Sequence, residues 1–193
     1  MAPRVIADAA EASRKAGRAG PGAVVVGVTG PVGAGKSTLA RRLSACVVST
    51  DNYLPDHETI EYLERDHPRH ADFARLATDL AALRRGSGIR VPVWSFQSHR
   101  REGTRELAPS EIVVCEGIHA LADGVREHVD IGVCVEASGA TRWERWADLE
   151  WRGARGWGVE RARAYFEQVA EPTFAAFEAE YRAAAQFVVV NDG

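Results

Sequence analysis

Basic residues are not in excess in this sequence, and lysine is scarce. The 24 Lys and Arg stand against 27 Asp and Glu, which leaves a formal net charge of −3 at pH 7. Proteins that coat DNA or RNA usually carry a basic surplus, so we expect no nucleic-acid partner. Only Lys15 and Lys36 are lysine, and in this arginine-rich background each is worth locating.

Long apolar runs and paired cysteines are also missing. No apolar run approaches 18 residues and the N-terminus has no signal-peptide core, so we expect a cytoplasmic protein without a membrane partner. Cys46, Cys115 and Cys134 form no C-x-x-C pair, which argues against a zinc knuckle or a disulfide framework. Each lies in a short apolar run, so we expect three buried thiols in a reducing compartment.

Five short β-branched runs are present instead, at residues 23–28, 46–49, 112–115, 131–135 and 187–190. They are continuous rather than alternating, which is typical of strands buried on both faces of a parallel sheet. Helical stretches are expected among them at 37–43, 73–83, 121–128 and 173–186. This alternation predicts a doubly wound α/β domain with right-handed crossovers.

We expect a single domain over residues 1–193. Residues 4–16 fit a short helix, and Gly17, Gly20, Pro21 and Gly22 break the chain after it, so 1–22 form an N-terminal helix and linker. Residues 87–107 contain an extended piece whose Pro92 places it at an edge or in an insertion. The run RGARGWG at 152–158 predicts a mobile loop, part of a lid over 142–158.

Residues 30–37 read GPVGAGKS, the pattern G-x-x-x-x-G-K-[ST], between a predicted strand and a predicted helix. Glycines let the backbone wrap around phosphate oxygens with its N–H groups pointing inward, and the helix N-terminus adds a positive dipole. We expect Lys36 to reach the β- and γ-phosphates and the Ser37 hydroxyl to ligate Mg²⁺. The predicted residues for ATP are Gly30, Gly33, Ala34, Gly35, Lys36, Ser37 and Thr38.

Two acidic residues follow other predicted strands, Asp51 after 46–49 and Glu116 after 112–115. Because ligands of open parallel sheets bind beyond the carboxyl ends of the strands, both should lie near the phosphate loop. Asp51 there can accept the proton of an attacking hydroxyl, and Glu116 can hold the water shell of Mg²⁺. A helix cap for Asp51 and a surface acid for Glu116 are the structural alternatives.

With these residues placed, the chain resembles the uridine kinase family, within the phosphoribulokinase and pantothenate kinase group of P-loop kinases. The resemblance covers roughly residues 23–190. Its motifs stand in the order GPVGAGKST, STDNY, DHP, VPVWSFQSHRR, VVCEGIHAL and YFEQVAEPTF. The implied fold is an α/β P-loop NTPase-type doubly wound parallel sheet of about five strands.

The resemblance also implies site residues. Asp51 would be the general base for a nucleoside 5′-hydroxyl, and Asp66, in DHP, would bind the ribose diol. Trp94, Phe96 and His99 would line the base pocket, where stacking on an aromatic wall contributes about 1–3 kcal/mol. Core packing of Trp94 and Phe96 and a surface position for His99 are the alternatives.

The lid and the base pocket depart from the family pattern. An aromatic residue that often precedes DHP is Arg65 here, the stretch from Asp51 to Asp66 is shorter than in well-known members, and a lid Arg-Asp pair becomes Ala147-Asp148. Arg152 is the best match to the lid arginine that precedes a glycine, with Arg155 in reserve, and both would contact the transferred phosphoryl group. The lid carries two further arginines, Arg142 and Arg145. It also carries four tryptophans, which we expect to pack it onto the domain: Trp143, Trp146, Trp151 and Trp157. A solvated face, with these arginines paired to neighbouring acids, is the alternative for the lid arginines.

These observations predict an ATP- and Mg²⁺-dependent kinase that phosphorylates uridine or cytidine to UMP or CMP, with Asp51, Lys36 and Arg152 as catalytic residues. A kinase of the same group acting on another nucleoside, a pantothenate-like molecule or a sugar is the first alternative. A nucleotide-binding module without catalysis is the second. Self-association into a homo-oligomer stays open.

Overall fold

The structure is a computed structural model, and it describes residues 2–16 and 22–193. Its main sheet has five parallel strands in the order β2-β5-β1-β6-β7. They are β1 Val24–Thr29, β2 Cys46–Ser49, β5 Ile112–Glu116, β6 Ile131–Glu136 and β7 Phe187–Val190. The five predicted strands and the doubly wound α/β class are confirmed. The predicted breakers Gly17, Gly20 and Pro21 lie outside the described residues.

Strand β1 shows why the apolar runs are continuous. Val25 faces a core cluster formed with α3 Phe73–Arg84, whereas Val24 and Val26 face a second cluster with α1 Ala2–Lys15 and α2 Lys36–Leu43. Successive side chains of a strand point to opposite faces, so a strand covered on both faces must be apolar throughout. The three cysteines are buried and unpaired, as expected.

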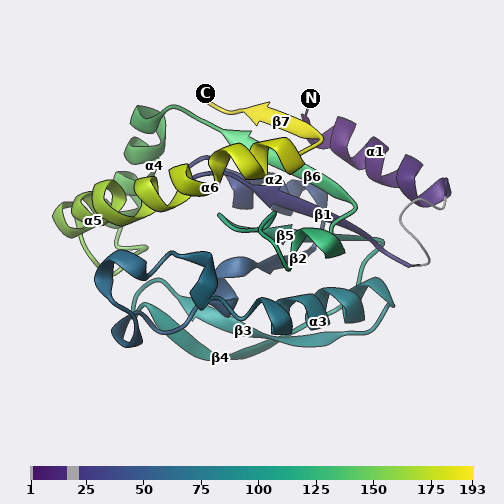
Figure 1. The fold of residues 1–193 in the computed structure, drawn as a ribbon, viewed down its shortest axis with the longest axis horizontal. Coiled ribbons are helices and arrows are strands. Elements are labelled where there is room, and N and C mark those ends of the chain that lie inside the picture. The colour runs from purple at the N-terminus through teal and green to yellow at the C-terminus, as the bar shows by residue number, and fades with distance from the viewer. Residues whose placement is uncertain (1, 17–21) are drawn as a thin grey trace.

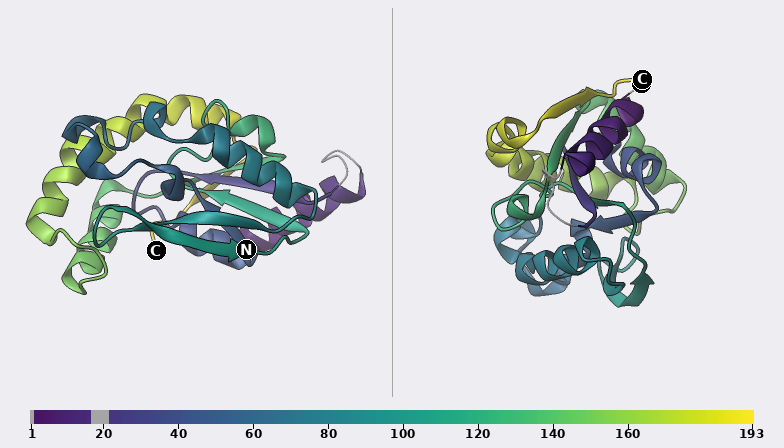
Figure 2. Two further views of the ribbon diagram at one scale, coloured as in Figure 1. Left: turned by 90° about the horizontal axis from the view of Figure 1, so that it is seen from below. Right: turned by 90° about the vertical axis from the view of Figure 1, so that its right-hand side faces the viewer.

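A second, two-stranded sheet lies outside the main one. It is an antiparallel hairpin of β3 Ile89–Ser95 and β4 Arg100–Leu107, with its pairing register shifted between Pro92 and Trp94. Figures 1 and 2 show the hairpin and α3 together on the side of the main sheet away from α1. The hairpin turn carries Phe96–His99 toward the carboxyl ends of the parallel strands, where the phosphate loop also lies.

The C-terminal helices complete the fold. Helix α4 Gly139–Trp151 is followed by a loop, then by α5 Val159–Tyr165, one π-helical turn at Phe166–Ala170, and α6 Glu171–Ala184. The predicted helices at 37–43, 73–83 and 173–186 correspond to α2, α3 and α6. Among the described residues, no helix is both long and apolar enough to cross a membrane.

One expected helix was wrong. Residues 121–128 form turns and a 3-10 turn at Arg126–His128 instead of an α-helix. Gly124 has φ +79°, a left-handed conformation that ends regular helix. Leu121 fits closely under Gly27 and Gly132 of the sheet, so the segment is shaped by the surface that it covers.

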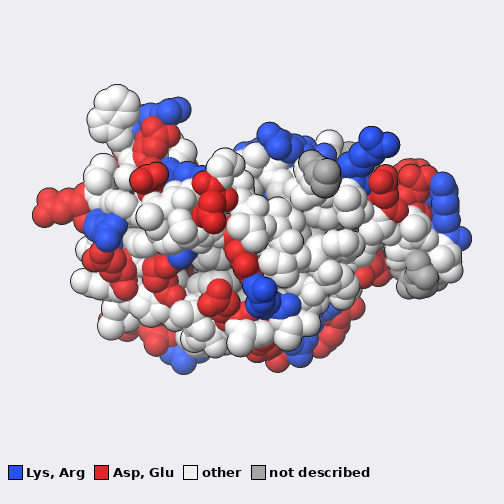
Figure 3. All heavy atoms as spheres, turned by 90° about the horizontal axis from the view of Figure 1, so that it is seen from above, with Lys and Arg blue, Asp and Glu red and all other residues white. Residues whose placement is uncertain are grey.

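The outer surface carries charges of both signs. On the face shown in Figure 3, acidic and basic side chains are interspersed rather than gathered into one basic patch. This distribution agrees with the near balance of charges in the sequence.

Candidate active site

The phosphate loop joins β1 to α2, and its glycines have the backbone conformations that the motif predicts. Gly33 has φ +77°, and a Cβ there would lie 2.5 Å from the Arg142 carbonyl oxygen. Gly35 caps α2 at φ +98°. The buried Lys36 ammonium donates to the Pro31 carbonyl oxygen at 2.9 Å. Burial lowers its pKa, and the carboxylates of Glu116 and Asp51 oppose that shift.

A cavity of about 620 Å³ opens beside this loop and brings most of the predicted residues together. Those that line it are Gly33, Gly35, Lys36, Ser37, Thr38, Asp51, Asp66, Trp94, Phe96, His99, Glu116 and Arg155. Gly30 and Ala34 do not line it. Ala34 is fully buried and its carbonyl oxygen accepts from Asn191 Nδ2 at 2.8 Å, so it holds the loop to the chain after β7.

Asp51 and Glu116 stand at the ends of neighbouring strands, because β2 and β5 pair in register with Ser49 opposite Glu116. Burial raises the pKa of both carboxyls, while Lys36 lowers both. Repulsion from the Asp51 carboxylate raises the pKa of Glu116 further, and a nearby cation would relieve it. Adjacent strand ends therefore concentrate negative charge next to the phosphate loop.

The donors around Ser37 suit a magnesium ion. The Ser37 hydroxyl donates to Glu116 Oε2 at 3.1 Å, so two oxygen ligands already lie together at the start of α2. Among the described residues, no group of three or more His, Cys, Asp or Glu could enclose a metal ion. Mg²⁺ does not need such a group, since it takes one or two protein oxygens and completes its shell with water and phosphate.

Asp66 is buried and held from two sides. The Tyr165 hydroxyl donates to Asp66 Oδ1 at 2.7 Å, and His119 Nε2 lies 2.6 Å from the Asp66 carbonyl oxygen. His119 is fixed in turn by the Tyr181 hydroxyl, 2.9 Å from Nδ1. Burial raises the pKa of Asp66 to about 6. Sequence reasoning missed Tyr165 and His119, although Tyr165 is the first residue of the motif YFEQVAEPTF and His119 lies within VVCEGIHAL.

The lid arginines separate by position, and the structure places Arg155 rather than the expected Arg152 at the cavity. The Arg152 side chain is 66% exposed, pairs with Asp148 at 2.8 Å and does not line the cavity. Arg155 does line it, with its guanidinium carbon 4.2 Å from the centroid of the Phe96 ring. Burial lowers the pKa of Arg155, and Asp51, Glu150 and Asp66 oppose that shift. Arg155 is thus the arginine that faces the acids of the site.

The tryptophans of the lid also separate. Trp143 and Trp146 contact Phe166 at ring-centroid distances of 5.6 and 5.7 Å, and Trp157 contacts Tyr165 at 4.4 Å. These three pack the lid onto the domain, as expected. Trp151 does not, because it is 81% exposed.

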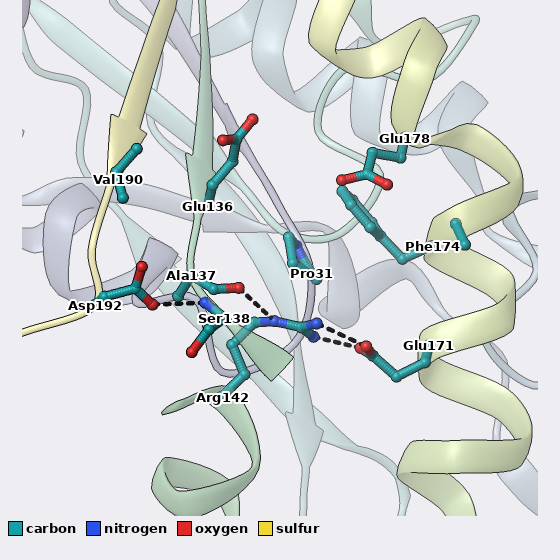
Figure 4. A pocket seen from close by; sticks show the side chains of 11 residues that line it. Pro31, Glu136, Ala137, Ser138, Arg142, Glu171, Phe174, Glu178, Val190 and Asp192 are labelled. Carbon is teal, nitrogen blue, oxygen red and sulfur yellow. Dashed lines mark hydrogen bonds and ion pairs between the residues drawn. The ribbon is translucent and has the colours of Figure 1, made fainter. Parts of the chain in front are cut away.

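The Arg142 side chain is held by contacts within the fold and does not line this cavity. Figure 4 shows its guanidinium directed at Glu171 of α6, with a bidentate ion pair whose longer contact is 2.6 Å, and its Nε donating to the Ala137 carbonyl oxygen at 2.9 Å. Arg142, Glu171 and Ala137 also line a second pocket, of about 330 Å³. Two other acids of this pocket are engaged as well, Glu136 with Arg182 and Asp192 with the Ser138 amide.

We expect Arg142→Met to destabilise the fold by about 2 kcal/mol. The substitution leaves the partly buried Glu171 carboxylate and two backbone carbonyl oxygens without the donor that they have in the wild type. The free energy of unfolding from urea titration checks this value. Arg152→Met is the matched control, since its exposed pair with Asp148 is worth well under about 1 kcal/mol. Equal losses in the two variants would contradict the structural role of Arg142.

Comparison with known proteins identifies the family of the chain. A model of the family described as "Phosphoribulokinase / Uridine kinase family" matches residues 55–180. The uridine kinase of Halobacterium salinarum is 32% identical over 170 residues, which are 77% of this chain and 75% of that protein. The inorganic pyrophosphatase TTM2 of Arabidopsis thaliana is 39% identical over 121 residues, 59% of this chain, but the match spans only 18% of its length.

Solved structures share the fold. A candidate fructose transport system kinase from Silicibacter sp. TM1040 superimposes with a TM-score of 0.68 at 22% identity, covering 87% of this chain and 90% of that one. The family match covers well over half of the chain and includes Asp66, the hairpin and the lid. The protein therefore belongs to the phosphoribulokinase/uridine kinase family of P-loop kinases.

Proposed function

We propose that the protein transfers the γ-phosphoryl group of ATP to the 5′-hydroxyl of a pyrimidine nucleoside, uridine or cytidine, giving UMP or CMP. The observation that carries the proposal is that Asp51, Lys36 and Arg155 line one cavity. The same cavity has aromatic walls and a buried carboxyl group, Asp66, that suits a ribose diol. A proton acceptor, phosphate donors and an acceptor pocket are the parts that phosphoryl transfer needs.

Each residue has a defined role in this reaction. Asp51 orients the acceptor hydroxyl and takes its proton as the new O–P bond forms and the bond to the β-phosphate oxygen breaks. Lys36 and Arg155 neutralise charge on the transferred group and on the departing ADP. Asp66, held by Tyr165, accepts hydrogen bonds from the ribose diol. When bound, Mg²⁺ would be held by Ser37 and through water by Glu116, and it would supply further charge neutralisation on the phosphates.

The acceptor is tested by a panel assay. The purified protein is incubated with ATP and Mg²⁺ and, in separate reactions, with uridine, cytidine, adenosine, ribose, fructose and pantothenate, and ADP and the phosphorylated product are measured. We expect uridine or cytidine to give the highest kcat/KM. A sugar or pantothenate at the top would instead favour another small-molecule kinase of the same family. Tight ATP binding with no transfer to any acceptor would point to a non-catalytic module.

A further inference from the structure

Three aromatic side chains that come from different parts of the chain meet at the acceptor end of the cavity. His57 lies in a 3-10 turn after β2, His99 at the end of the hairpin turn, and Trp157 in the loop after α4. The His99 and Trp157 rings stack with centroids 4.0 Å apart and an interplanar angle of 21°. His57 stacks on His99 at 5.3 Å and 13°. All three line the cavity.

The two imidazoles keep hydrogen-bonding capacity for a ligand. Among the described residues, His57 Nδ1 and His99 Nε2 are both buried without a hydrogen-bond partner. Burial lowers the pKa of His57 to about 3 and that of His99 to about 4, so both rings are neutral at pH 7. A neutral imidazole offers one donor and one acceptor. A buried polar atom left unpaired is unfavourable, so a ligand that pairs with it gains binding free energy.

Backbone contacts fix the positions of these rings. The His57 amide donates to the His99 carbonyl oxygen at 3.0 Å, and the His99 amide donates to the Ser95 carbonyl oxygen at 2.8 Å. His99 has φ +53°, the one described non-glycine residue with positive φ. A strained, doubly held residue beside a cavity is typical of a binding site.

The loop that carries Trp157 is docked on the same hairpin turn. The Gly156 amide donates to the Phe96 carbonyl oxygen at 3.1 Å, and Gln97 Nε2 donates to the Gly153 carbonyl oxygen at 2.6 Å. A Cβ at Gly156 would collide with the Gln97 carbonyl oxygen. Trp157 is therefore placed against His99 by backbone contacts as well as by stacking.

We infer that His57 and Trp157 are specificity-determining residues, which with His99 form a wall that selects acceptors bearing an uncharged planar heterocycle. A planar ring stacks on this wall, and its carbonyl and amino edge pairs with the free imidazole nitrogens. A cationic ring is disfavoured by the guanidiniums whose charge reaches both imidazoles, Arg65 and Arg161. A sugar without a base has neither a planar ring to stack on the wall nor a carbonyl and amino edge to pair with the imidazoles. This inference rests on the proposed function, since it names the part of the acceptor that the pocket recognises.

The test compares uridine with ribose, which offers a hydroxyl without a base, as acceptors for the purified protein. His57→Phe keeps the ring and removes the nitrogens, so KM for uridine should rise about 3- to 10-fold with kcat nearly unchanged. Trp157→Ala should lower the ratio of kcat/KM for uridine to that for ribose about 10-fold, and Trp157→Phe should restore most of it. Taking the ratio cancels any effect of the loop on Arg155. His128→Phe, outside the cavity, is the control.

Calorimetric titration with uridine in the absence of ATP separates this inference from the proposed function. If the wild type phosphorylates uridine but both variants keep the uridine-to-ribose ratio within about twofold, the inference is overturned and the function stands. If no acceptor is phosphorylated but uridine binds and His57→Phe weakens that binding, the inference stands without the function. Absence of uridine binding to the wild type would overturn it.

Discussion

Asp51→Asn is expected to lower kcat for the nucleoside about 10²- to 10⁴-fold while leaving the affinity for ATP nearly unchanged. Asparagine has almost the same shape but cannot accept the hydroxyl proton. Asp51 lies in the turn directly after β2 and is not part of the phosphate loop, although it lines the same cavity. Steady-state kinetics with the best acceptor and calorimetric titration with ATP measure the two effects separately.

Two outcomes would contradict this role for Asp51. A rate within about threefold of the wild type would show that the proton goes elsewhere. A large loss of ATP affinity would show instead that Asp51 acts through the electrostatics of Lys36, whose pKa it raises. Asp148→Asn is the matched control, because that carboxylate lines the same cavity but pairs with the exposed Arg152.

Arg155→Ala is expected to lower kcat about 10²- to 10³-fold, because it removes the cation that faces Asp51 and Asp66 from the lid. Arg152→Ala should change kcat less than about threefold, since its guanidinium is exposed and points to Asp148. The two residues lie three positions apart in one loop, so the pair of variants controls for general damage to that loop. Single-turnover phosphoryl transfer checks both.

The reverse order of effects would overturn the assignment of Arg155. Arg152 would then enter the cavity only when substrates are bound, and Arg155 would serve mainly to pack between Phe96 and Trp146, over whose rings it lies at 4.2 and 5.0 Å. Arg155→Lys distinguishes packing from charge, because it keeps the positive charge but loses the planar stacking group.

Much of the site could be predicted where the signal is local. The phosphate loop depends on glycines, a lysine and a serine that are adjacent in the chain, and the strand ends that carry Asp51 and Glu116 follow from the parallel-sheet pattern. These residues line one cavity in the structure. The strands themselves were predictable because burial on both faces demands unbroken apolar runs.

The structure departs from expectation where the fold decides between similar residues. The lid holds Arg142, Arg145, Arg152 and Arg155 within one helix and its following loop, and no spacing rule says which guanidinium turns inward. Arg142 is taken by Glu171, twenty-nine residues along the chain, and Arg155 is turned inward by the docking of its loop on the hairpin. The expected helix at 121–128 failed for a related reason, since Gly124 and the fit of Leu121 under the sheet overrode the periodicity.

The sequence by itself determined the sheet, the phosphate loop and the acids at the strand ends, because each depends on neighbours within a few residues or on a period along one strand. Only the tertiary structure decided which arginine faces the acids, which tyrosine holds Asp66, and that His57, His99 and Trp157 share one wall. Those choices depend on contacts between segments separated by up to about a hundred residues. Side chains there compete for partners in space, and the spacing of residues along the sequence does not show which partner each side chain takes.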